Sequence, residues 1–565
     1  MSSLVGRPPS DGRADPMRVL FVAKDAFYLR NFESLLRALC ARGHRVHVAF
    51  ENEPAPEFRQ GLVEVLESAL PTFSTGPVPK RGSRRWRRTS DELRRSLDYL
   101  PYLHPRYDAA PSLRARAAAL APRVVRRMTS GRALRAPGGL EWLDRLLSLV
   151  ERGVPTSRTL ARFIGDHGAD VVVVSPLLQL GSRQADVLRA ARRLGLPTCF
   201  CAYSWDNLTT KGRIRGAPDL VTVWNELQRW EAIELHGVEP DRVVAAGASA
   251  YDHWFGWRPR TSREEFCATV GLTPDRPYVL YVGSALLSGD ETAFVRTWVE
   301  GLRGSPRTTL ERAGILVRPH PQRPLDVERL DLTGQPNAAL WPPPGARALG
   351  LEARAALFDS IFHAAAVVGL NTSAFIDAAI IGRPSLAILP PEFRDSQEGT
   401  LHFRYLREAG GGLLTVAGSL EEHADQLAET LAASDRRPVR GERFVEAFVR
   451  PRGVDVAATG ALVEAIEAQA AAGPRPVRRR LVEETVGFVL AAGLSEVLRW
   501  REERVPRRAA RRARRLGRRH WKRLRRIRKR VRRLSTTPQR PEAGRRRSAA
   551  PSGSRGGRWP APRRS

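Results

Sequence analysis

The sequence is poor in cysteine, with four in 565 residues. So few thiols cannot build the disulfide framework of a small extracellular domain, and they indicate a reducing compartment. Cys199 and Cys201 alternate along an apolar run, so we expect them to pack as reduced side chains in a buried strand rather than to bind a metal. The scarcity of cysteine therefore predicts a cytoplasmic protein.

Long apolar runs are missing as well. The nearest candidate, "TVGFVLAAGL" at 485–494, is shorter than the roughly 18–20 residues that cross a bilayer. The opening residues, "MSSLVGRPPSDGRADP", lack the apolar centre of a secretion signal, and we expect residues 1–16 to be disordered. The pattern predicts neither a membrane-spanning segment nor a secretion signal.

Acidic residues are few in the last part of the chain. From Arg475 onward, 32 Lys and Arg stand against 6 Asp and Glu, a net charge of +26 out of +33 for the whole chain. We expect a basic helical extension at 475–534 and a disordered tail at 535–565. Residues 507–534 contain 17 basic and no acidic residues, and the apolar side chains that recur there at helical spacing are Trp521, Leu524, Ile527, Val531 and Leu534.

A basic helix with a narrow apolar stripe is typical of a segment that lies on an anionic membrane surface. Two alternatives stay open, since the extension is otherwise either solvated or bound to nucleic acid through its charge alone. Nucleic acid is not expected as a specific partner, because almost any tail of this charge binds polyanions weakly. We therefore predict a cytoplasmic protein with a peripheral contact, through 507–534, to the inner face of the cell membrane.

The body of the chain alternates predicted strands and helices. Residues 17–50, "MRVLFVAKDAFYLRNFESLLRALCARGHRVHVAF", form a β-α-β pattern, which predicts a parallel sheet. An arginine-rich helical insertion at about 80–140 interrupts the pattern, which later starts afresh at "YVLYVGSALL". We predict an α/β fold of two Rossmann-like doubly wound domains that face a cleft, at 17–255 and 278–474, with a linker at 256–277.

Small or polar residues follow three predicted strands of the second domain. Small residues let a ligand approach, and an arginine and a helix N-terminus favour a diphosphate. His320 can hydrogen-bond or protonate that group, and Asp377 lies one turn into a helix, where it can meet a ribose hydroxyl. The alternative for the last loop is an ordinary helix capped by Ser373. The predicted donor nucleotide and diphosphate site consists of Gly283, Ser284, Arg318, His320, Asn371, Thr372, Ser373 and Asp377.

Two loops of the first domain are predicted to face the acceptor. In "YSWDNLTTKGR" (203–213), Trp205 is a candidate to stack on a sugar, Asp206 to deprotonate an acceptor hydroxyl and Lys211 to meet a phosphate. The alternative is that Asp206 or Asn207 only caps a turn. Asp206 and His320 are the candidate catalytic residues. The predicted acceptor-side residues are Lys24, Asp25, Arg30, Asn31, Trp205, Asn207 and Lys211.

The body of the chain, about residues 17–470, resembles the two-Rossmann (GT-B-type) nucleotide-sugar glycosyltransferases. It is also similar to the related UDP-N-acetylglucosamine 2-epimerases and CDP-glycerol glycerophosphotransferases. The motifs that carry the resemblance are "RGHRVHVAF", "LVTVWNELQRWEAIELHGVEPDRVVAAGASAYD", "RPHP" and "GLNTSAFIDAAIIGRPSLAIL". It implies that the last motif holds the donor diphosphate through its backbone, with Asp377 where an acidic residue commonly meets the ribose.

The sequence also departs from these relatives. The first loop is "AKDAFYLRN" instead of a glycine-rich "G-x-G-G-H", and "YSWDNL" stands where the 2-epimerases have "H-x-E-A-G" and the glycerophosphotransferases "W-H-G-T". No D-x-D occurs, and the resemblance implies neither a divalent metal nor another cofactor. We expect a metal-independent glycosyltransferase that moves a sugar from a nucleotide-activated donor to a cell-surface polysaccharide or lipid-linked glycan. The alternatives are a nucleotide-sugar 2-epimerase, a CDP-glycerol-type glycerophosphotransferase and, outside enzymes, a nucleic-acid-binding protein.

Overall fold

The computed structural model describes residues 16–131, 134, 138–285, 289–321, 323–343, 350–433, 439–476 and 481–501. The chain divides into two units, Met1–Glu496 and Val497–Ser565. The first unit contains both sheets. Residues 1–15 of the segment 1–16 that was expected to be disordered, the basic segment 507–534 and the tail 535–565 lie outside the described residues.

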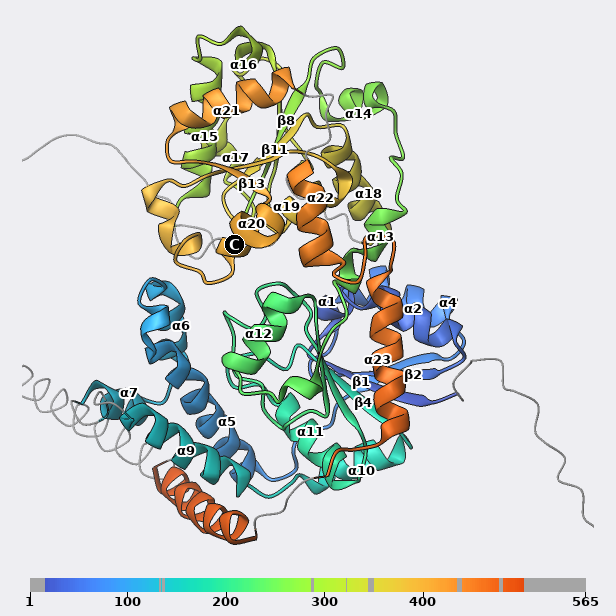
Figure 1. Cartoon of the computed structure of the whole chain (residues 1–565), viewed down its shortest axis with the longest axis vertical. Coiled ribbons are helices and arrows are strands. Elements are labelled where there is room, and N and C mark those ends of the chain that lie inside the picture. The colour runs from blue at the N-terminus through green and yellow to red at the C-terminus, as the bar shows by residue number, and fades with distance from the viewer. Residues whose placement is uncertain are drawn as a thin grey trace, which may run out of the picture. The chain divides into compact units, whose positions relative to one another are not determined.

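Seven parallel strands form the first sheet, in the order β3-β2-β1-β4-β5-β6-β7 (Figure 1). Val171–Ser175 is buried along its whole length, as expected of a strand covered on both faces. The strand order reverses between β1 and β4, the kind of position at which doubly wound folds bind ligands. The strands are β1 (Arg18–Ala23), β2 (Arg45–Phe50), β3 (Phe73–Pro77), β4 (Val171–Ser175), β5 (Thr198–Cys201), β6 (Leu220–Val223) and β7 (Val243–Ala245).

Six parallel strands form the second sheet, in the order β10-β9-β8-β11-β12-β13. This order again reverses at the first strand of the series, between β8 and β11, so each sheet has the Rossmann-like arrangement. The prediction of two Rossmann-like α/β domains is therefore confirmed. The strands are β8 (Tyr278–Val282), β9 (Gly314–Arg318), β10 (Ala338–Leu340), β11 (Ala366–Gly369), β12 (Ser385–Ile388) and β13 (Leu414–Ala417).

Helices follow most strands of both domains. Those of the first domain are α1 (Ala26–Leu29), α2 (Glu33–Ala41), α3 (Pro56–Phe58), α4 (Glu64–Ala69), α10 (Arg158–Asp166), α11 (Gln184–Arg193), α12 (Glu226–Glu234) and α13 (Asp252–Phe255). The helices from the predicted linker (256–277) onward are α14 (Arg263–Val270), α15 (Glu291–Arg303), α16 (Thr308–Arg312), α17 (Val327–Leu330), α18 (Leu351–Phe362), α19 (Ala374–Ile381), α20 (Phe403–Glu408), α21 (Leu420–Ala432), α22 (Val439–Phe444) and α23 (Ala458–Ala472).

The last of these helices belongs by its contacts to the first domain. Leu462, Val463 and Ile466 of α23 are buried in one apolar cluster with Phe21 of β1 and Leu36 of α2. The residues of α23 fall within the second domain predicted from the sequence, 278–474. The cluster shows that the apolar face of α23 packs on the first domain instead. The chain thus returns from the second domain and covers the first sheet.

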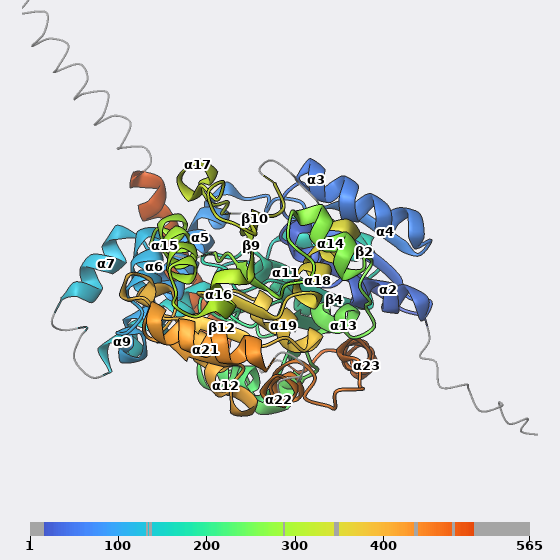
Figure 2. The same cartoon turned by 90° about the horizontal axis from the view of Figure 1, so that it is seen from above.

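The arginine-rich insertion is a helical subdomain with an apolar cluster of its own. It places Tyr102, Tyr107, Leu113 and Leu143 in a shared buried cluster. Figures 1 and 2 both show its helices gathered together beside the first sheet. The elements are α5 (Arg84–Tyr99), the 3-10 turns η2 (Leu100–Leu103) and η3 (Pro105–Tyr107), α6 (Pro111–Leu120), α7 (Arg123–Ser130) and α9 (Gly139–Arg152). Among the described helices, none is both long and apolar enough to cross a membrane.

Candidate functional site

The two domains contact one another. The Asn225 side-chain amide, after β6, donates a hydrogen bond of 2.9 Å to the Phe448 carbonyl of the second domain. Arg354 of α18 pairs with Glu33 of α2 at 2.8 Å. The acceptor-side loop takes part in these contacts, since Trp205 lies against His402 of the second domain.

Asp206 lies at the centre of the acceptor-side loop as an ionised and fully engaged carboxylate. Its Oδ1 accepts from the Ser204 hydroxyl at 2.5 Å, and its Oδ2 accepts from Thr210 at 3.0 Å and from the Lys211 ammonium at 2.7 Å. Burial disfavours the charge, but the Lys211 ammonium outweighs it, so the pKa of Asp206 lies well below its usual range. Its role as a base stays a prediction, and the structure adds that it fixes Lys211.

Two neighbours of Asp206 are placed differently from the prediction. Trp205 is 7% exposed and lies edge-on to His402 of the second domain, with 4.6 Å between ring centroids. Its indole is thus packed into the core and is not free to stack on a sugar. Asn207 is fully buried, and its Oδ1 accepts from the Tyr203 amide at 3.2 Å. It caps the turn from inside, which is the alternative that the sequence left open.

The first loop, after β1, contributes a cap and two aromatic contacts. Asp25 accepts from the Phe27 amide at 3.0 Å and so caps α1. The Lys24 ammonium lies 6.0 Å from the centre of the Tyr28 ring, and the Arg30 guanidinium lies 3.9 Å from that of Phe27. The backbone amide of Asn31 donates a hydrogen bond of 3.1 Å to the Tyr28 carbonyl. Lys24 and Arg30 therefore supply positive charge at this edge.

Residues of the three donor-side loops lie close together. The backbone amide of Asn371 donates a hydrogen bond of 3.2 Å to the Ser284 hydroxyl, and this bond links the loops that follow β8 and β11. A side chain on Gly283 would lie 2.8 Å from the His320 backbone nitrogen, so glycine is required where the exits of β8 and β9 approach each other. The Asn371 amide side chain donates to the Ser396 carbonyl at 2.6 Å. The geometry therefore places Gly283, Ser284, His320 and Asn371 together.

The start of α19 differs in detail from the predicted cap. Ser373 makes no side-chain capping bond, and its side chain is exposed. The neighbouring Thr372 is buried instead, and its hydroxyl accepts from the Ala374 amide at 3.4 Å. The alternative that the sequence left open, a helix capped by the Ser373 side chain, is therefore wrong, because the hydroxyl that accepts from the first turn is that of Thr372. The Ser373 hydroxyl is left at the surface of the loop, where a ligand can reach it.

Arg318 points into the second domain rather than along the loop. Its Nη1 donates to the Ser360 hydroxyl of α18 at 3.1 Å, and burial lowers its pKa to about 10. Burial, followed by the positive charges of Arg30 and Arg323, lowers the pKa of His320 to about 4. At neutral pH the His320 imidazole is therefore uncharged, so it offers a hydrogen bond but not a positive charge to a diphosphate.

Several acidic groups of the site have raised pKa values. Burial raises the pKa of Asp377 to about 7, against a hydrogen bond from Trp254 that lowers it. Burial likewise raises the pKa of Glu291, which accepts from the Ser284 amide at 2.9 Å, to about 7. Asp377 is only 7% exposed, so it is shielded where it was expected to meet a ribose. Perturbed acids of this kind gather at functional sites.

Sequence reasoning missed two acids. Glu51 directly follows β2, and burial raises its pKa to about 7; its position at a strand exit is a signal that could have found it. Glu231 of α12 accepts a hydrogen bond from the Tyr405 hydroxyl of α20, and burial raises its pKa to about 8. No local pattern marks Glu231, because its partner is 174 residues away.

The described residues contain no group of three or more His, Cys, Asp or Glu side chains that could hold a metal ion. What they do offer is hydrogen-bonding chemistry. On one side are a small-residue loop and an exposed hydroxyl at a helix start, which suit phosphate oxygens. On the other is the Asp206–Lys211 pair, which suits a polar group that carries a transferable proton.

No protein-family model matches the chain, and no curated protein matches it in sequence. Solved structures resemble it in fold. A putative UDP-N-acetylglucosamine 2-epimerase from Listeria monocytogenes is 12% identical, with 82% of this chain and 100% of that one covered and a TM-score of 0.46. A glycosyltransferase from Rickettsia africae is 9% identical, with 80% and 99% covered and a TM-score of 0.46. The UDP-GlcNAc 2-epimerase from Methanocaldococcus jannaschii is 12% identical, with 80% and 99% covered and a TM-score of 0.45.

Proposed function

We propose that the protein is a glycosyltransferase that takes a sugar from a nucleotide-activated donor and passes it to a polysaccharide or lipid-linked glycan. The observation that carries the proposal is the junction of the donor loops, where Ser284 bonds Asn371 and Gly283 lies against His320. This junction leaves the exposed Ser373 hydroxyl and the start of α19 for a diphosphate. The Asp206–Lys211 pair of the first domain is the acceptor side of the proposed reaction.

The proposed donor site predicts that a negative charge at Ser373 weakens nucleotide binding. A Ser373→Glu variant is expected to lose at least tenfold in affinity for the donor, about 1.4 kcal/mol, because the carboxylate repels the diphosphate. Calorimetry with UDP-, GDP-, dTDP- and CMP-sugars measures this and identifies the donor base. Thr308→Glu is the matched control, since Thr308 is exposed at the start of α16 in the same domain.

Two results would contradict this assignment. Wild-type protein that binds none of these nucleotides has no donor site, and a Ser373→Glu variant with wild-type affinity has its site elsewhere. The epimerase alternative is separated by incubation with UDP-N-acetylglucosamine and no acceptor. Appearance of the 2-epimer under those conditions replaces the transferase assignment with an isomerase one.

We also propose peripheral attachment to the cytoplasmic face of the membrane, where a lipid-linked acceptor would be reached. The basic segment 507–534 is outside the described residues, but apolar side chains on the preceding helical stretch 481–496 support attachment. Val482 is 77% exposed and Val489 is 62% exposed on the same face of that stretch. On α7, the exposed Val124 and Met128 stand among arginines. Exposed apolar groups beside arginines suit an anionic lipid surface.

Attachment of this kind predicts selective binding to anionic vesicles. Full-length protein is expected to co-sediment with phosphatidylcholine vesicles that contain phosphatidylglycerol, and not with pure phosphatidylcholine, because arginines require the anionic headgroup. A Val482→Glu/Val489→Glu double variant should bind at least fivefold more weakly, since it places charges on the apolar face. Equal binding of both vesicle types, or of both proteins, would contradict the proposal.

A further inference from the structure

The helical insertion binds the backbone of the acceptor-side loop at successive residues. The Tyr107 hydroxyl donates to the Thr209 carbonyl at 3.1 Å, and the Tyr102 hydroxyl donates to the Lys211 carbonyl at 2.8 Å. The carbonyl between them, that of Thr210, accepts from the Arg116 guanidinium. Three consecutive loop carbonyls thus accept hydrogen bonds from side chains of one subdomain, which lie about 100 residues away in the sequence.

The two tyrosine donors are buried in the apolar cluster of the insertion. Tyr102 and Tyr107 are 1% and 5% exposed, and their rings lie 4.7 Å apart. Burial raises the pKa of Tyr107 to about 12 and that of Tyr102 further, so both hydroxyls keep their protons. Each hydroxyl can therefore act as a permanent donor to a loop carbonyl.

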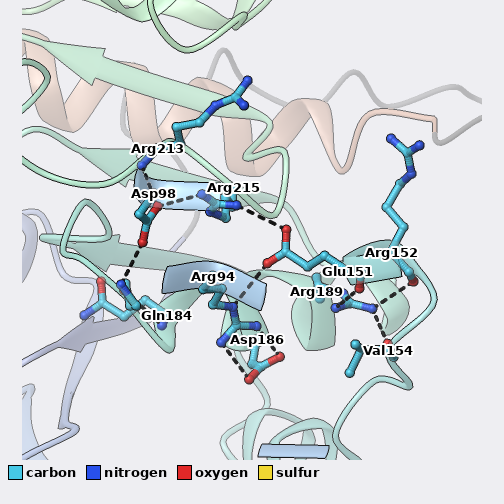
Figure 3. A network of polar contacts seen from close by, with 12 residues as sticks. Arg94, Asp98, Glu151, Arg152, Val154, Gln184, Asp186, Arg189, Arg213 and Arg215 are labelled. Carbon is cyan, nitrogen blue, oxygen red and sulfur yellow. Dashed lines mark hydrogen bonds and ion pairs between the residues drawn. The ribbon is translucent and has the colours of Figure 1, made fainter. Parts of the chain in front are cut away.

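Asp98, near the end of α5, holds the next part of the loop. Its Oδ1 accepts from the Arg213 amide at 3.1 Å and from the Arg215 guanidinium at 2.6 Å. A side chain on Gly212 would lie 2.8 Å from the same Oδ1, so the loop can approach Asp98 only through a glycine. Figure 3 shows that Arg215 also forms an ion pair with Glu151 of α9, which in turn pairs with Arg94.

The insertion also reaches the donor side. The Ser112 hydroxyl at the start of α6 donates to the Asp395 carboxylate of the second domain at 3.1 Å. Asp395 precedes Ser396, whose carbonyl accepts from the Asn371 side chain of the donor loop. One subdomain therefore contacts the acceptor-side loop and a neighbour of the donor loop.

We propose that the helical insertion is the positioning element of the acceptor side, and that Asp98, Tyr102, Tyr107 and Arg116 are its positioning residues. They fix the backbone at 209–213, and through it the Lys211 ammonium that bonds Asp206. None of the four is assigned contact with substrate; they act through Lys211 and Asp206. The assignment of this loop to an acceptor rests on the proposed function, whereas the clamp itself rests on the contacts alone.

The test removes only the two hydroxyls, in a Tyr102→Phe/Tyr107→Phe variant of the full-length protein. Hydrogen exchange of the amides in 204–213 is expected to accelerate at least tenfold, because two loop carbonyls lose their partners. Donor affinity in calorimetry should stay within twofold of wild type, while kcat for sugar transfer falls at least tenfold. Tyr99→Phe is the matched control, since Tyr99 is buried in the same insertion and its hydroxyl has no hydrogen bond among the described residues.

Each result decides a different point. Unchanged exchange at 204–213 overturns the clamp, and faster exchange with wild-type kcat overturns the positioning role. A general loss of stability would appear equally in the thermal midpoint and in exchange outside the loop, which the Tyr99→Phe control calibrates. If wild-type protein binds no nucleotide sugar, the proposed function fails, and the exchange experiment still tests the clamp.

Discussion

An Asp206→Asn variant is expected to release nucleoside diphosphate from the donor at least 100-fold more slowly than wild type, with unchanged donor affinity. The amide keeps the size of the side chain but removes the charge that pairs with Lys211 at 2.7 Å. It also removes the carboxylate that we propose to accept the acceptor's proton. General acid–base catalysis by a positioned side chain contributes roughly 10²–10⁴-fold, so a loss in that range is expected in kcat.

A Lys211→Met variant shows which of the two roles dominates. If Asp206 acts only by holding Lys211, then Asp206→Asn, Lys211→Met and the double variant all lose the same factor, because they break one unit. If Asp206 also takes a proton, its variant loses more than Lys211→Met. An Asp206→Asn enzyme within threefold of wild-type kcat would remove Asp206 from the machinery altogether.

The two domains could be predicted because their strands are short apolar runs with clear flanking loops. β4, "VVVVS", is buried at every position, and such runs in a β-α-β rhythm have one reasonable arrangement. Strand topology then brings the exits together whatever the side chains do, which is why Ser284 and Asn371, which follow β8 and β11, lie within hydrogen-bonding distance. The contact of α23 with the first sheet was not predicted, since an apolar helix face does not say which sheet it covers.

The orientation of single side chains was less predictable, because it depends on partners that are remote in sequence. Trp205 follows a strand, as a ligand-binding residue would, yet it packs on His402 of the second domain. Arg318 stands beside His320 in a favourable motif, yet it bonds Ser360. The insertion was recognisable only as an arginine-rich helical stretch. Its role follows from Tyr102, whose acceptor lies 109 residues further along the chain.

Replacement of Arg94 by methionine is expected to destabilise the first domain strongly. Arg94 is 1% exposed, and its two Nη atoms bond Asp186 at 2.7 and 3.1 Å while its Nε bonds Glu151 at 3.3 Å (Figure 3). Methionine fills similar space, but it removes a positive charge from beside the Asp186 and Glu151 carboxylates. Breaking a buried pair in this way costs roughly 3–5 kcal/mol of unfolding free energy. Arg85→Met, which breaks an exposed pair with Glu496, should cost at most about 1 kcal/mol.

The pH dependence of this loss separates charge from packing. In the wild type, burial opposes ionisation of Asp186, but Arg94 outweighs it and holds the pKa of Asp186 well below its usual range. Its contribution is therefore present above the ordinary aspartate pKa of about 3.9 and is lost as the pH falls below that value. In Arg94→Met the carboxylates of the folded state bind protons more readily, so the variant gains stability as the pH falls from 8 to 5. The loss in unfolding free energy relative to wild type, measured by urea unfolding followed by circular dichroism, should thus be smaller at pH 5 than at pH 8. An equal loss at both pH values would mean that lost packing, and not the uncompensated charge, causes it.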